Sequence, residues 1–492
     1  MMRQTRSGLT ACCLAALLTG CGGGDNRNSG GSFAGPPTPA PTTGPAPSPT
    51  STQCALRERQ DWALARLQEW YLFPDLLDSS VNPASHTTVQ GYIDALVAPA
   101  RALGRDRFFT YITSIAEENA FYERGSSAGF GVRLSYDTPN RRVLVTEAFE
   151  SGTALAAGID RGAQLIEIQT PGQASQSVEA LMAMGGSAAV VNALGPSDPG
   201  VTRTLVFRDP TGVTRTATIA KTDYTLDPVS DRYGARIIMD GGKRVGYLNL
   251  RTFINTAEPD LRAAFADFKA QGVTELVIDL RYNGGGLISI GELLGDLMAE
   301  GRNGQLFEYI AFRPSKSNQD KSYFFRVQPQ SIAPTKIAFI GTGSTASASE
   351  LVINGFVPFL GTNMALIGSN TFGKPVGQIA LDRPACDDRL RAVALKIENA
   401  NRQGEYYNGL AATVPVTCAA SDDVTRQLGD PQEAMISVAL DFLAGRACTP
   451  ISARLGASAA EAGTRIGTPA IREALTPEQP ADTFQREVPG AF

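Results

Sequence analysis

The sequence predicts a mixed α/β protein that is built from several domains. At 492 residues the chain is too long for a single hydrophobic core. Its apolar pattern changes twice: helical spacing near the N-terminus gives way to short strands from about residue 121, and alternating strands and helices follow from about residue 245. We therefore expect a helical domain, a β-rich domain and a core of alternating strands and helices.

The first 52 residues are predicted to lie outside this fold. A basic start precedes a short apolar run, Leu9 to Leu18, and Leu18-Thr19-Gly20-Cys21 is similar to a bacterial lipobox. The likeness implies a lipoprotein signal peptide over residues 1–20 and lipid attachment to Cys21; an ordinary secretory signal is the alternative. Gly22, rather than Asp, follows the cysteine, and by analogy with Gram-negative lipoproteins this favours the outer membrane, facing the periplasm. Residues 21–52, rich in Pro, Gly, Ser and Thr, are expected to form a disordered tether.

The net charge and the cysteines limit the kinds of partner and the cellular compartment that the sequence allows. The formal net charge of −5 does not indicate a nucleic-acid surface. Beyond the signal segment and the lipid cysteine lie Cys54, Cys386, Cys418 and Cys448, and an even number outside the cytoplasm suggests disulfides. We expect the pairs Cys386–Cys418 and Cys54–Cys448, although sequence alone cannot choose among the pairings; four buried free thiols are the alternative.

Residues 53–118 are predicted to form the helical domain. Apolar residues recur there mostly at helical steps, and a second helix is expected over Val89 to Val97. The residues of the first helix that recur mostly at three- and four-residue steps are Trp62, Leu64, Leu67, Trp70 and Tyr71. We expect these aromatic side chains to belong to a core rather than to a functional site.

Residues 119–222 are predicted to form the β-rich domain. Short strands are expected over 129–134, 142–146, 162–168, 204–207 and 215–219. Their order, with an Ala-Ala-Gly-Ile turn before the third, closely resembles a PDZ domain. The resemblance implies that Gly129, Phe130, Gly131 and Val132 present backbone N–H groups to the C-terminal carboxylate of a peptide, which pairs with the strand that follows. The alternative is a glycine turn that binds nothing.

Residues 223–448 are predicted to form the core. Strands are expected over 245–250 and 276–280, and helices over 259–271 and 287–299. A glycine turn, Asn283-Gly284-Gly285-Gly286, follows the second strand without the Lys-Ser/Thr of a phosphate loop. Such a turn lets backbone N–H groups approach a substrate closely, as an oxyanion hole requires.

A serine and a lysine follow two further strands of this core. Thr345–Glu350 contains Ser347 and Ser349 between an apolar strand and a helical run, and Thr371–Gln378 places Lys374 after the next strand. Because they follow neighbouring strands, the two segments can meet in one site. The simpler interpretation is that the serines only cap a helix.

The histidine count points to lysine as the base. The chain has a single histidine, His86, far upstream, so a Ser-His-Asp triad is disfavoured and a histidine-based zinc site is excluded. Lys374 can accept the serine proton only if burial lowers its pKa well below about 10.4. Gln378 lies four residues further on and can orient the amine.

With these motifs in order, the chain resembles the carboxy-terminal processing proteases, tail-specific serine peptidases with a Ser-Lys dyad. The resemblance covers roughly residues 60–445 and rests on Gly-Tyr-Leu-Asn-Leu, Asp-Leu-Arg-x-Asn-x-Gly-Gly, Ser-Ala-Ser-Glu and Thr-Phe-Gly-Lys in that order. It implies that Ser347 is the nucleophile, Lys374 the base and Gln378 the orienting residue. It further implies an oxyanion hole made of the N–H groups of Ala348 and Gly285, with no metal and no cofactor.

The sequence departs from the family pattern at several points. The interval from Ser347 to Lys374 is about two residues longer than the family's, which keeps Ser349 as the alternative nucleophile. Gly284 stands in the turn where proline is common, and Pro375 follows the lysine where glycine is common.

The sequence thus predicts a serine endopeptidase that cleaves unfolded or C-terminal segments of proteins through a Ser-Lys acyl-enzyme. Its substrate has a free C-terminus that docks in the PDZ-like domain. The alternatives are a catalytically inactive, lipid-anchored PDZ peptide-binding protein and a Ser-Lys acyltransferase or amidase acting on cell-wall peptide. The sequence does not determine the oligomeric state, and no chemistry is predicted for residues 449–492.

Overall fold

The computed structural model describes residues 54–451, 473–477 and 483–492. The predicted signal peptide, the tether and Cys21 lie outside the described residues. Among the described helices, none combines the length and the apolar character needed to cross a bilayer. The expected mixed α/β class is confirmed, since helices alternate with several sheets along the chain.

The core is built on a six-stranded sheet with the strand order β10-β11-β12-β15-β16-β19. The pair β10–β11 is antiparallel and every other pair is parallel. The middle strands are buried on both faces, which explains why they are continuous apolar runs in the sequence. The strands are β10 (Ala235–Asp240), β11 (Lys243–Asn249), β12 (Glu275–Asp279), β15 (Lys336–Gly341), β16 (Met364–Gly368) and β19 (Thr417–Ala419).

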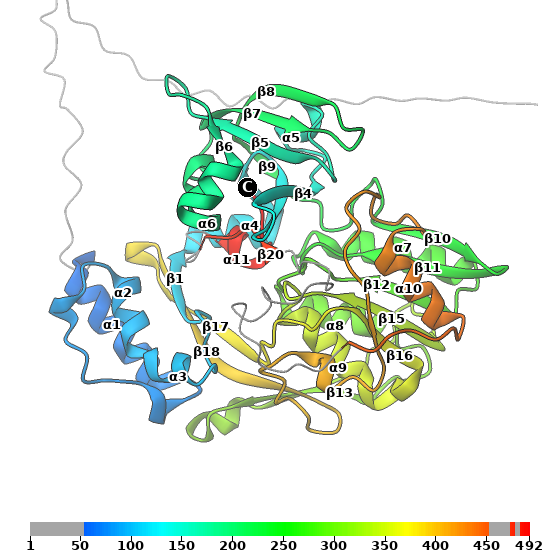
Figure 1. Cartoon of the computed structure of the whole chain (residues 1–492). Helices are drawn as coiled ribbons and strands as arrows, with labels where there is room; N and C mark the ends of the chain where they lie inside the picture. Colours follow the sequence, from blue (N-terminus) through cyan, green and yellow to red (C-terminus); the bar gives the residue numbers. More distant parts are fainter. Residues whose placement is uncertain (1–53, 452–472, 478–482) are drawn as a thin grey trace, which may run out of the picture. The chain divides into compact units, whose positions relative to one another are not determined.

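Helices cover both faces of this sheet. Ile278 of β12 lies in one apolar cluster with residues of α7 (Ala257–Ala270), α8 (Ile288–Leu297) and α9 (Ala348–Leu360). The neighbouring Val277 points to the other face and lies in a second cluster with residues of α10 (Ala434–Leu443). Figure 1 shows α7, α8, α9 and α10 around the strands of this sheet. Because the strands are parallel, their carboxyl ends lie at one edge, where the segments after β12, β15 and β16 meet.

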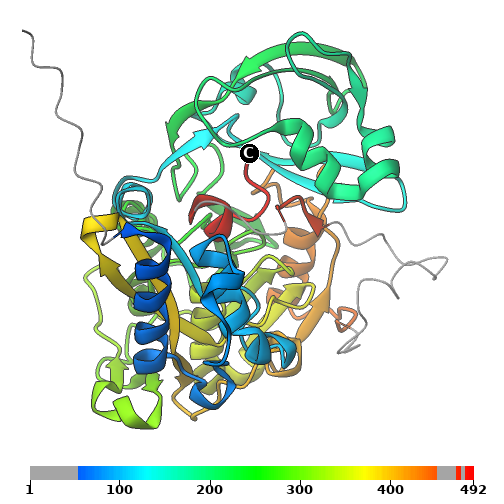
Figure 2. The ribbon, with the colours of Figure 1, turned by 90° about the vertical axis from the view of Figure 1, so that its left-hand side faces the viewer.

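A second sheet has the order β1-β18-β13-β14, with β17 paired to β18. Its strands are β1 (Tyr111–Ser114), β13 (Leu306–Phe312), β14 (Lys321–Phe324), β17 (Val376–Arg383) and β18 (Asp388–Asn399). The predicted N-terminal helices are present as α1 (Leu56–Trp70), α2 (Val89–Leu96) and α3 (Ala98–Ala102). In Figure 2 these blue helices lie beside the yellow β17–β18 hairpin, and Leu67 and Val393 share one apolar cluster. The helices therefore do not form a separate core.

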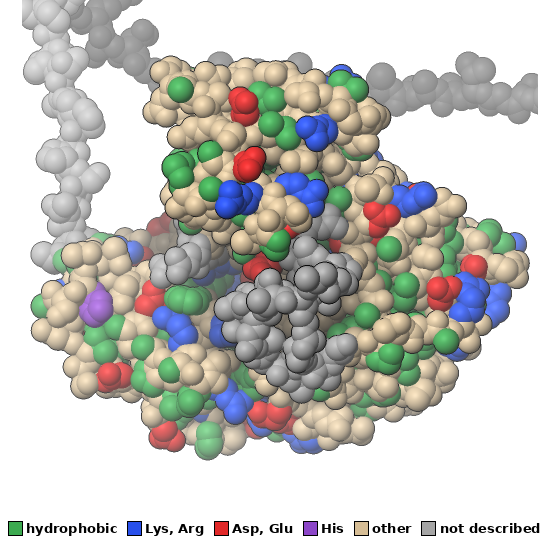
Figure 3. Space-filling model, viewed as in Figure 1, with side chains coloured by type: hydrophobic (Ala, Val, Ile, Leu, Met, Phe, Trp, Pro, Cys, Tyr) green, Lys and Arg blue, Asp and Glu red, His purple; other side chains and the backbone are tan. Residues whose placement is uncertain are grey.

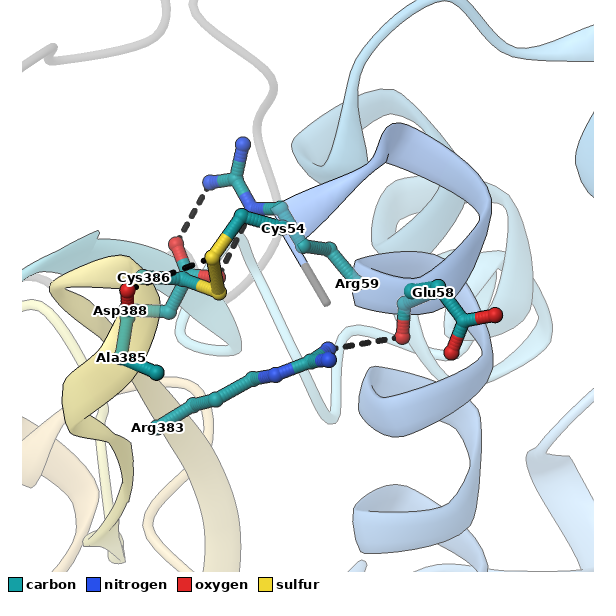
Figure 4. The surroundings of a disulfide bond; sticks show 7 residues. All are labelled: Cys54, Glu58, Arg59, Arg383, Ala385, Cys386 and Asp388. Atoms are coloured by element: carbon teal, nitrogen blue, oxygen red, sulfur yellow. Dashed lines mark hydrogen bonds and ion pairs between the residues drawn. A yellow bond between two sulfur atoms is a disulfide. The ribbon is translucent and has the colours of Figure 1, made fainter. Parts of the chain in front are cut away.

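The expected disulfide pairing is wrong. Cys54 bonds to Cys386 and Cys418 bonds to Cys448. Cys54 stands just before α1, which packs on β18, and Cys386 lies in the turn between β17 and β18. Figure 4 shows that the ion pair of Arg59 and Asp388 flanks this bond. Cys418 lies in β19 and Cys448 shortly after α10, which packs on the same sheet. The pairing follows from these packings, which the spacing of the cysteines does not reveal.

The β-rich region holds a seven-stranded sheet of order β20-β3-β4-β5-β7-β8, with β6 paired to β5. Its strands are β3 (Val132–Asp137), β4 (Arg142–Ala148), β5 (Gln164–Gln169), β6 (Gln176–Ser177), β7 (Thr202–Arg208), β8 (Thr214–Ala220) and β20 (Glu473–Ala474). Helices α4 (Ile115–Arg124), α5 (Thr153–Ala156) and α6 (Val178–Leu194) accompany it, and β2 (Ser126–Gly129) pairs with β9 (Thr222–Thr225). Helix α6 was not predicted from the sequence. It is kinked at Gly185 and Gly186.

The last described segments, 473–477 and 483–492, contact the elements of this β-rich region. Strand β20 pairs antiparallel with β3, and the short helix α11 (Thr483–Glu487) lies in an apolar cluster with residues from α4 and β9. The last described residues, 483–492, are mostly buried.

Acidic and basic side chains are interspersed on the face of the molecule shown in Figure 3. His86 is the purple side chain in that view, and its ring lies 5.8 Å from the ring of Tyr92, centroid to centroid. It belongs to the N-terminal region, and in the described part of the chain it forms no hydrogen bond or ring contact with Ser347 or Lys374.

Candidate active site

Ser347 stands between strand β15 and helix α9, as the sequence predicts. Its backbone has φ 56° and ψ −117°, a conformation that non-glycine residues rarely adopt. Such strain persists only where the surrounding structure imposes it, and it concentrates at functional sites. The turn leaves the Ser347 side chain half-buried, directly before the first N–H groups of a helix.

The alternative serine, Ser349, is placed differently. It is fully buried, and its hydroxyl donates a hydrogen bond of 3.1 Å to the carbonyl oxygen of Asn283. This bond ties α9 to the glycine turn after β12. The geometry therefore gives Ser349 a structural role and favours Ser347 as the accessible hydroxyl.

Lys374 and Gln378 lie together after β16. The Lys374 amine donates a hydrogen bond of 3.0 Å to Gln378 Oε1, and Gln378 Nε2 in turn donates to the carbonyl oxygen of Phe109. The ring centroid of Phe109 lies 5.1 Å from Lys374 Nζ. Burial lowers the pKa of Lys374, because it disfavours the ammonium form. The amine is thus oriented and moved toward the neutral form that a general base requires.

Glu350 joins the serine segment to the lysine segment. Its Oε2 accepts hydrogen bonds from the backbone N–H groups of Ser347, at 3.2 Å, and Lys374, at 2.7 Å. Its Oε1 accepts from the hydroxyl of Thr371 at 2.5 Å and from the N–H of Gly373 at 2.7 Å. Burial raises the pKa of Glu350, although these donors oppose the shift. No role is predicted for Glu350 from the sequence, but its place three residues after Ser347 is the spacing of a capping box.

The glycine turn lies against Ser347. Gly285 has φ 120°, and a Cβ there would stand 2.7 Å from the Cβ of Ser347 and 3.2 Å from the nitrogen of Ala348, so only glycine fits. The Gly285 N–H, predicted as an oxyanion donor, donates to Asn283 Oδ1 at 2.9 Å. Its neighbour Gly284 instead donates at 3.2 Å to the carbonyl oxygen of Glu487. The turn therefore packs Gly285 against Ser347, while the N–H groups of Gly285 and Gly284 are bonded to Asn283 and Glu487.

The turn itself is held by a buried ion network. Arg281 makes a bidentate contact with Asp279, through Nε–Oδ1 at 3.0 Å and Nη2–Oδ2 at 2.8 Å. The same guanidinium reaches Glu433 Oε2 at 2.9 Å and Asp422 Oδ1 at 3.0 Å. The network fixes the strand end from which the turn departs, since all of these groups are fully or largely buried.

Glu487 belongs to residues 449–492, for which the sequence predicts no chemistry. Its carboxyl group is buried, and its charge interacts with that of Lys374. Burial raises the pKa of Glu487, while the lysine opposes the shift. The sequence gives no signal for this contact, because the two residues lie far apart in the chain and no motif surrounds Glu487.

Residues 244–405 match the model of peptidase family S41. The matched segment contains Ser347, Lys374, Gln378 and the glycine turn.

Two curated relatives carry related sequences. A carboxyl-terminal-processing protease of Picosynechococcus sp. is 27% identical over 264 residues, which are 53% of this chain and 57% of that protein. A chloroplastic C-terminal processing peptidase of Tetradesmus obliquus is 27% identical over 269 residues, which are 52% of this chain and 53% of that protein. The chain thus spans a little over half the length of these relatives.

A solved structure shares the fold. A putative S41 protease from Bacteroides fragilis aligns with a TM-score of 0.60 at 22% identity, over 78% of this chain and 97% of that one. The S41 match and the named relatives support a serine-type peptidase, and this structure supports the S41 fold.

Proposed function

We propose that the chain is a serine endopeptidase that hydrolyses peptide bonds through a Ser347–Lys374 dyad. The observation that carries the proposal is the arrangement of the lysine. Its amine is buried, bonded to Gln378, and fixed relative to Ser347 because both backbones share Glu350. A half-buried lysine and a strained, half-buried serine whose backbones share one carboxylate are suited to this proton transfer.

The chemical steps follow from these positions. Neutral Lys374 takes the proton of the Ser347 hydroxyl as the oxygen attacks the substrate carbonyl carbon. The N–H of Ala348 and an amide of the turn, Gly285 or Gly284, stabilise the resulting oxyanion. The protonated lysine then returns the proton to the leaving amine. Water, deprotonated by the same lysine, attacks the acyl-enzyme, and the lysine passes this proton to the leaving Ser347 oxygen as the second product is released.

The substrate is proposed to dock through the PDZ-like domain. Gly129–Val132 leads into β3, and the first β3 residues can pair with an extended peptide. This is the mode by which a free C-terminus would be held while an upstream segment reaches Ser347. The processing activity named for the curated relatives is compatible with such docking.

The enzyme is further proposed to be lipid-anchored through Cys21 in the cell envelope, at the outer membrane facing the periplasm. The proposal rests on the lipobox-like segment and on the two disulfides, which form outside a reducing cytoplasm. Labelled palmitate should enter the wild-type protein in a bacterial host, whereas Cys21→Ala should remain unlabelled and leave the membrane fraction.

The test of the peptidase activity compares serine and lysine variants on an unfolded protein with an apolar tail. Ser347→Ala and Lys374→Ala should abolish cleavage, whereas Ser349→Ala should retain it if the variant folds. A fluorophosphonate probe should label the wild type at Ser347. Loss of cleavage with folded Ser349→Ala alone would move the nucleophile to Ser349. No cleavage and no labelling under any condition would favour the inactive peptide-binding protein.

A further inference from the structure

The final residues of the sequence lie along β3 as an added strand. The N–H of Phe492 donates to the carbonyl oxygen of Val132 at 2.9 Å, and the N–H of Leu134 donates to the oxygen of Gly490 at 2.7 Å. Ala491 forms an antiparallel bridge with Arg133. These bonds occupy the edge of β3 that faces away from β4, the edge a peptide would need.

The segment ends in the loop predicted to hold a peptide carboxylate. The N–H groups of Gly131 and Val132 donate to the Phe492 oxygen at 3.0 and 3.1 Å. A Cβ at Gly129 would stand 2.6 Å from the Phe492 carbonyl carbon, so only glycine lets it come this close. The Phe492 side chain is buried in the same apolar cluster as Phe130. The buried ammonium of Lys221 lies 5.9 Å from the Phe492 ring centroid.

The residues just before this strand contact the glycine turn of the candidate active site. The oxygen of Glu487 accepts a hydrogen bond from the turn amide of Gly284, next to Gly285 and Ser347. Arg133 bonds both to the oxygen of Pro489, at 2.7 Å, and to the oxygen of Tyr282 in the turn, at 3.1 Å. One continuous segment therefore fills the peptide groove and lies at the glycine turn. Figure 1 marks the chain end within the β-rich region, close to β4 and β9.

We propose that residues 483–492 are an internal peptide ligand that blocks the Ser347 site. The same groove takes the ends of other proteins that carry a small residue followed by a large apolar one, as Ala491-Phe492 does. This inference rests on the proposed peptidase function for its blocking part, while the binding part stands on the groove alone. A substrate end of this class competes with the internal segment and displaces it.

Two physical effects combine in the blocked form. Another peptide cannot pair with β3 while the N–H and C=O groups of this strand are hydrogen-bonded to Phe492 and Gly490. In addition, the Glu487 carboxylate favours the ammonium form of Lys374, which cannot accept the serine proton. Displacement of the segment by a substrate end frees the edge of β3 and the Gly284 amide of the turn.

The binding part is tested in the full chain carrying Ser347→Ala, which cannot cleave what it binds. The probe is a labelled peptide of the sequence Glu487–Phe492 with a free carboxylate. Adding Phe492→Asp should lower the Kd of this peptide by about 10-fold or more relative to the parent, because the groove is then open. The control Met184→Asp adds the same charge at an exposed position of the same domain, 74% accessible, and should bind as weakly as the parent. A peptide ending in an amide or in Asp should bind more weakly.

Two outcomes would overturn the binding part. Equally tight binding by the parent and Phe492→Asp would mean that the segment does not compete, and no binding by either would mean that the groove takes no such peptide. Hydrogen exchange of the unaltered chain gives a readout that needs no variant. The amides of Gly131, Val132 and Leu134 should exchange slowly, and exchange at the rate of an unpaired strand edge would contradict docking.

The blocking part is read separately in chains that retain Ser347. Phe492→Asp should cleave an unfolded protein about 10-fold faster than wild type, and Met184→Asp should cleave at the wild-type rate. Equal rates for wild type and Phe492→Asp, with the binding results as expected, would overturn blocking. Expected peptide binding without any cleavage would instead contradict the peptidase function and leave the internal ligand standing.

Discussion

At the scale of single residues, the site depends on the protonation of Lys374. Its neutral form is the base, so activity should fall as the pH drops through its pKa, which burial places below that of free lysine, about 10.4. Phe109→Ala admits water beside the amine, raises this pKa and should move the acid limb of kcat/KM to higher pH. A pH–rate profile of both proteins checks this. An unchanged midpoint in Phe109→Ala would show that the ring does not set the lysine's environment.

Glu350 is a positioning residue, because it contacts backbone N–H groups of both segments rather than the reacting atoms. Glu350→Gln removes two of its acceptor interactions and should lower kcat by about 10²-fold with a smaller change in KM, as expected for a misplaced dyad. Glu405→Gln, at an exposed ion pair with Arg105, serves as the control and should change neither constant. If Glu350→Gln lowers only the melting temperature, the role of Glu350 is structural alone.

The site residues that could be predicted from the sequence are those within a recognisable local motif. Ser347, Lys374 and Gln378 could be proposed because each stands at a fixed place after an apolar strand, and the structure brings Lys374 into contact with Gln378. Glu350 could also have been predicted, because it lies at capping-box spacing from Ser347. Glu487 was not, since its approach to Lys374 depends on how the last residues return across the fold.

At the scale of elements, the contrast between the sheets is instructive. Strands β11, β12, β15 and β16 were predicted because burial on both faces makes them continuous apolar runs. Strands β13 and β14 were not predicted, although they join β18 in the second sheet. Exposed residues alternate irregularly in β14, so the period that signals a half-buried strand is weak there.

The disulfide between Cys54 and Cys386 should stabilise the attachment of α1 to the second sheet. It closes a loop with a sequence separation of 332 residues, against 30 for Cys418–Cys448. Chain entropy therefore predicts a loss of about 2–5 kcal/mol in unfolding free energy when both Cys54 and Cys386 become Ser, and a smaller loss for the other pair. Urea denaturation of the two double variants measures this. A larger loss for Cys418→Ser with Cys448→Ser would contradict the entropic account.

At the scale of the whole molecule, a buried ion network joins the β-rich region to the core. Arg251, which follows β11, donates to Glu147 of β4 at 2.7 Å, and Arg133 of β3 donates to the same carboxylate at 3.0 Å. Burial pushes the pKa of Glu147 upward, but the two guanidinium groups outweigh it and lower the pKa to about 2. The network thus holds the seven-stranded sheet of the β-rich region and the six-stranded sheet of the core together.

Removing Arg251 leaves the Glu147 carboxylate with less compensation in a site where its side chain is 1% exposed. Arg251→Ala should therefore lower the unfolding free energy by about 3–5 kcal/mol near neutral pH. Because the folded pKa of Glu147 lies below its unfolded value, the wild type should lose this contribution as the pH falls from about 4.5 through about 2, and the variant should lose less over that window. The control is Arg215→Ala, at an ion pair whose arginine is 56% exposed, which should cost less than about 1 kcal/mol. Equal losses in the two variants would mean that this network does not hold the two regions together.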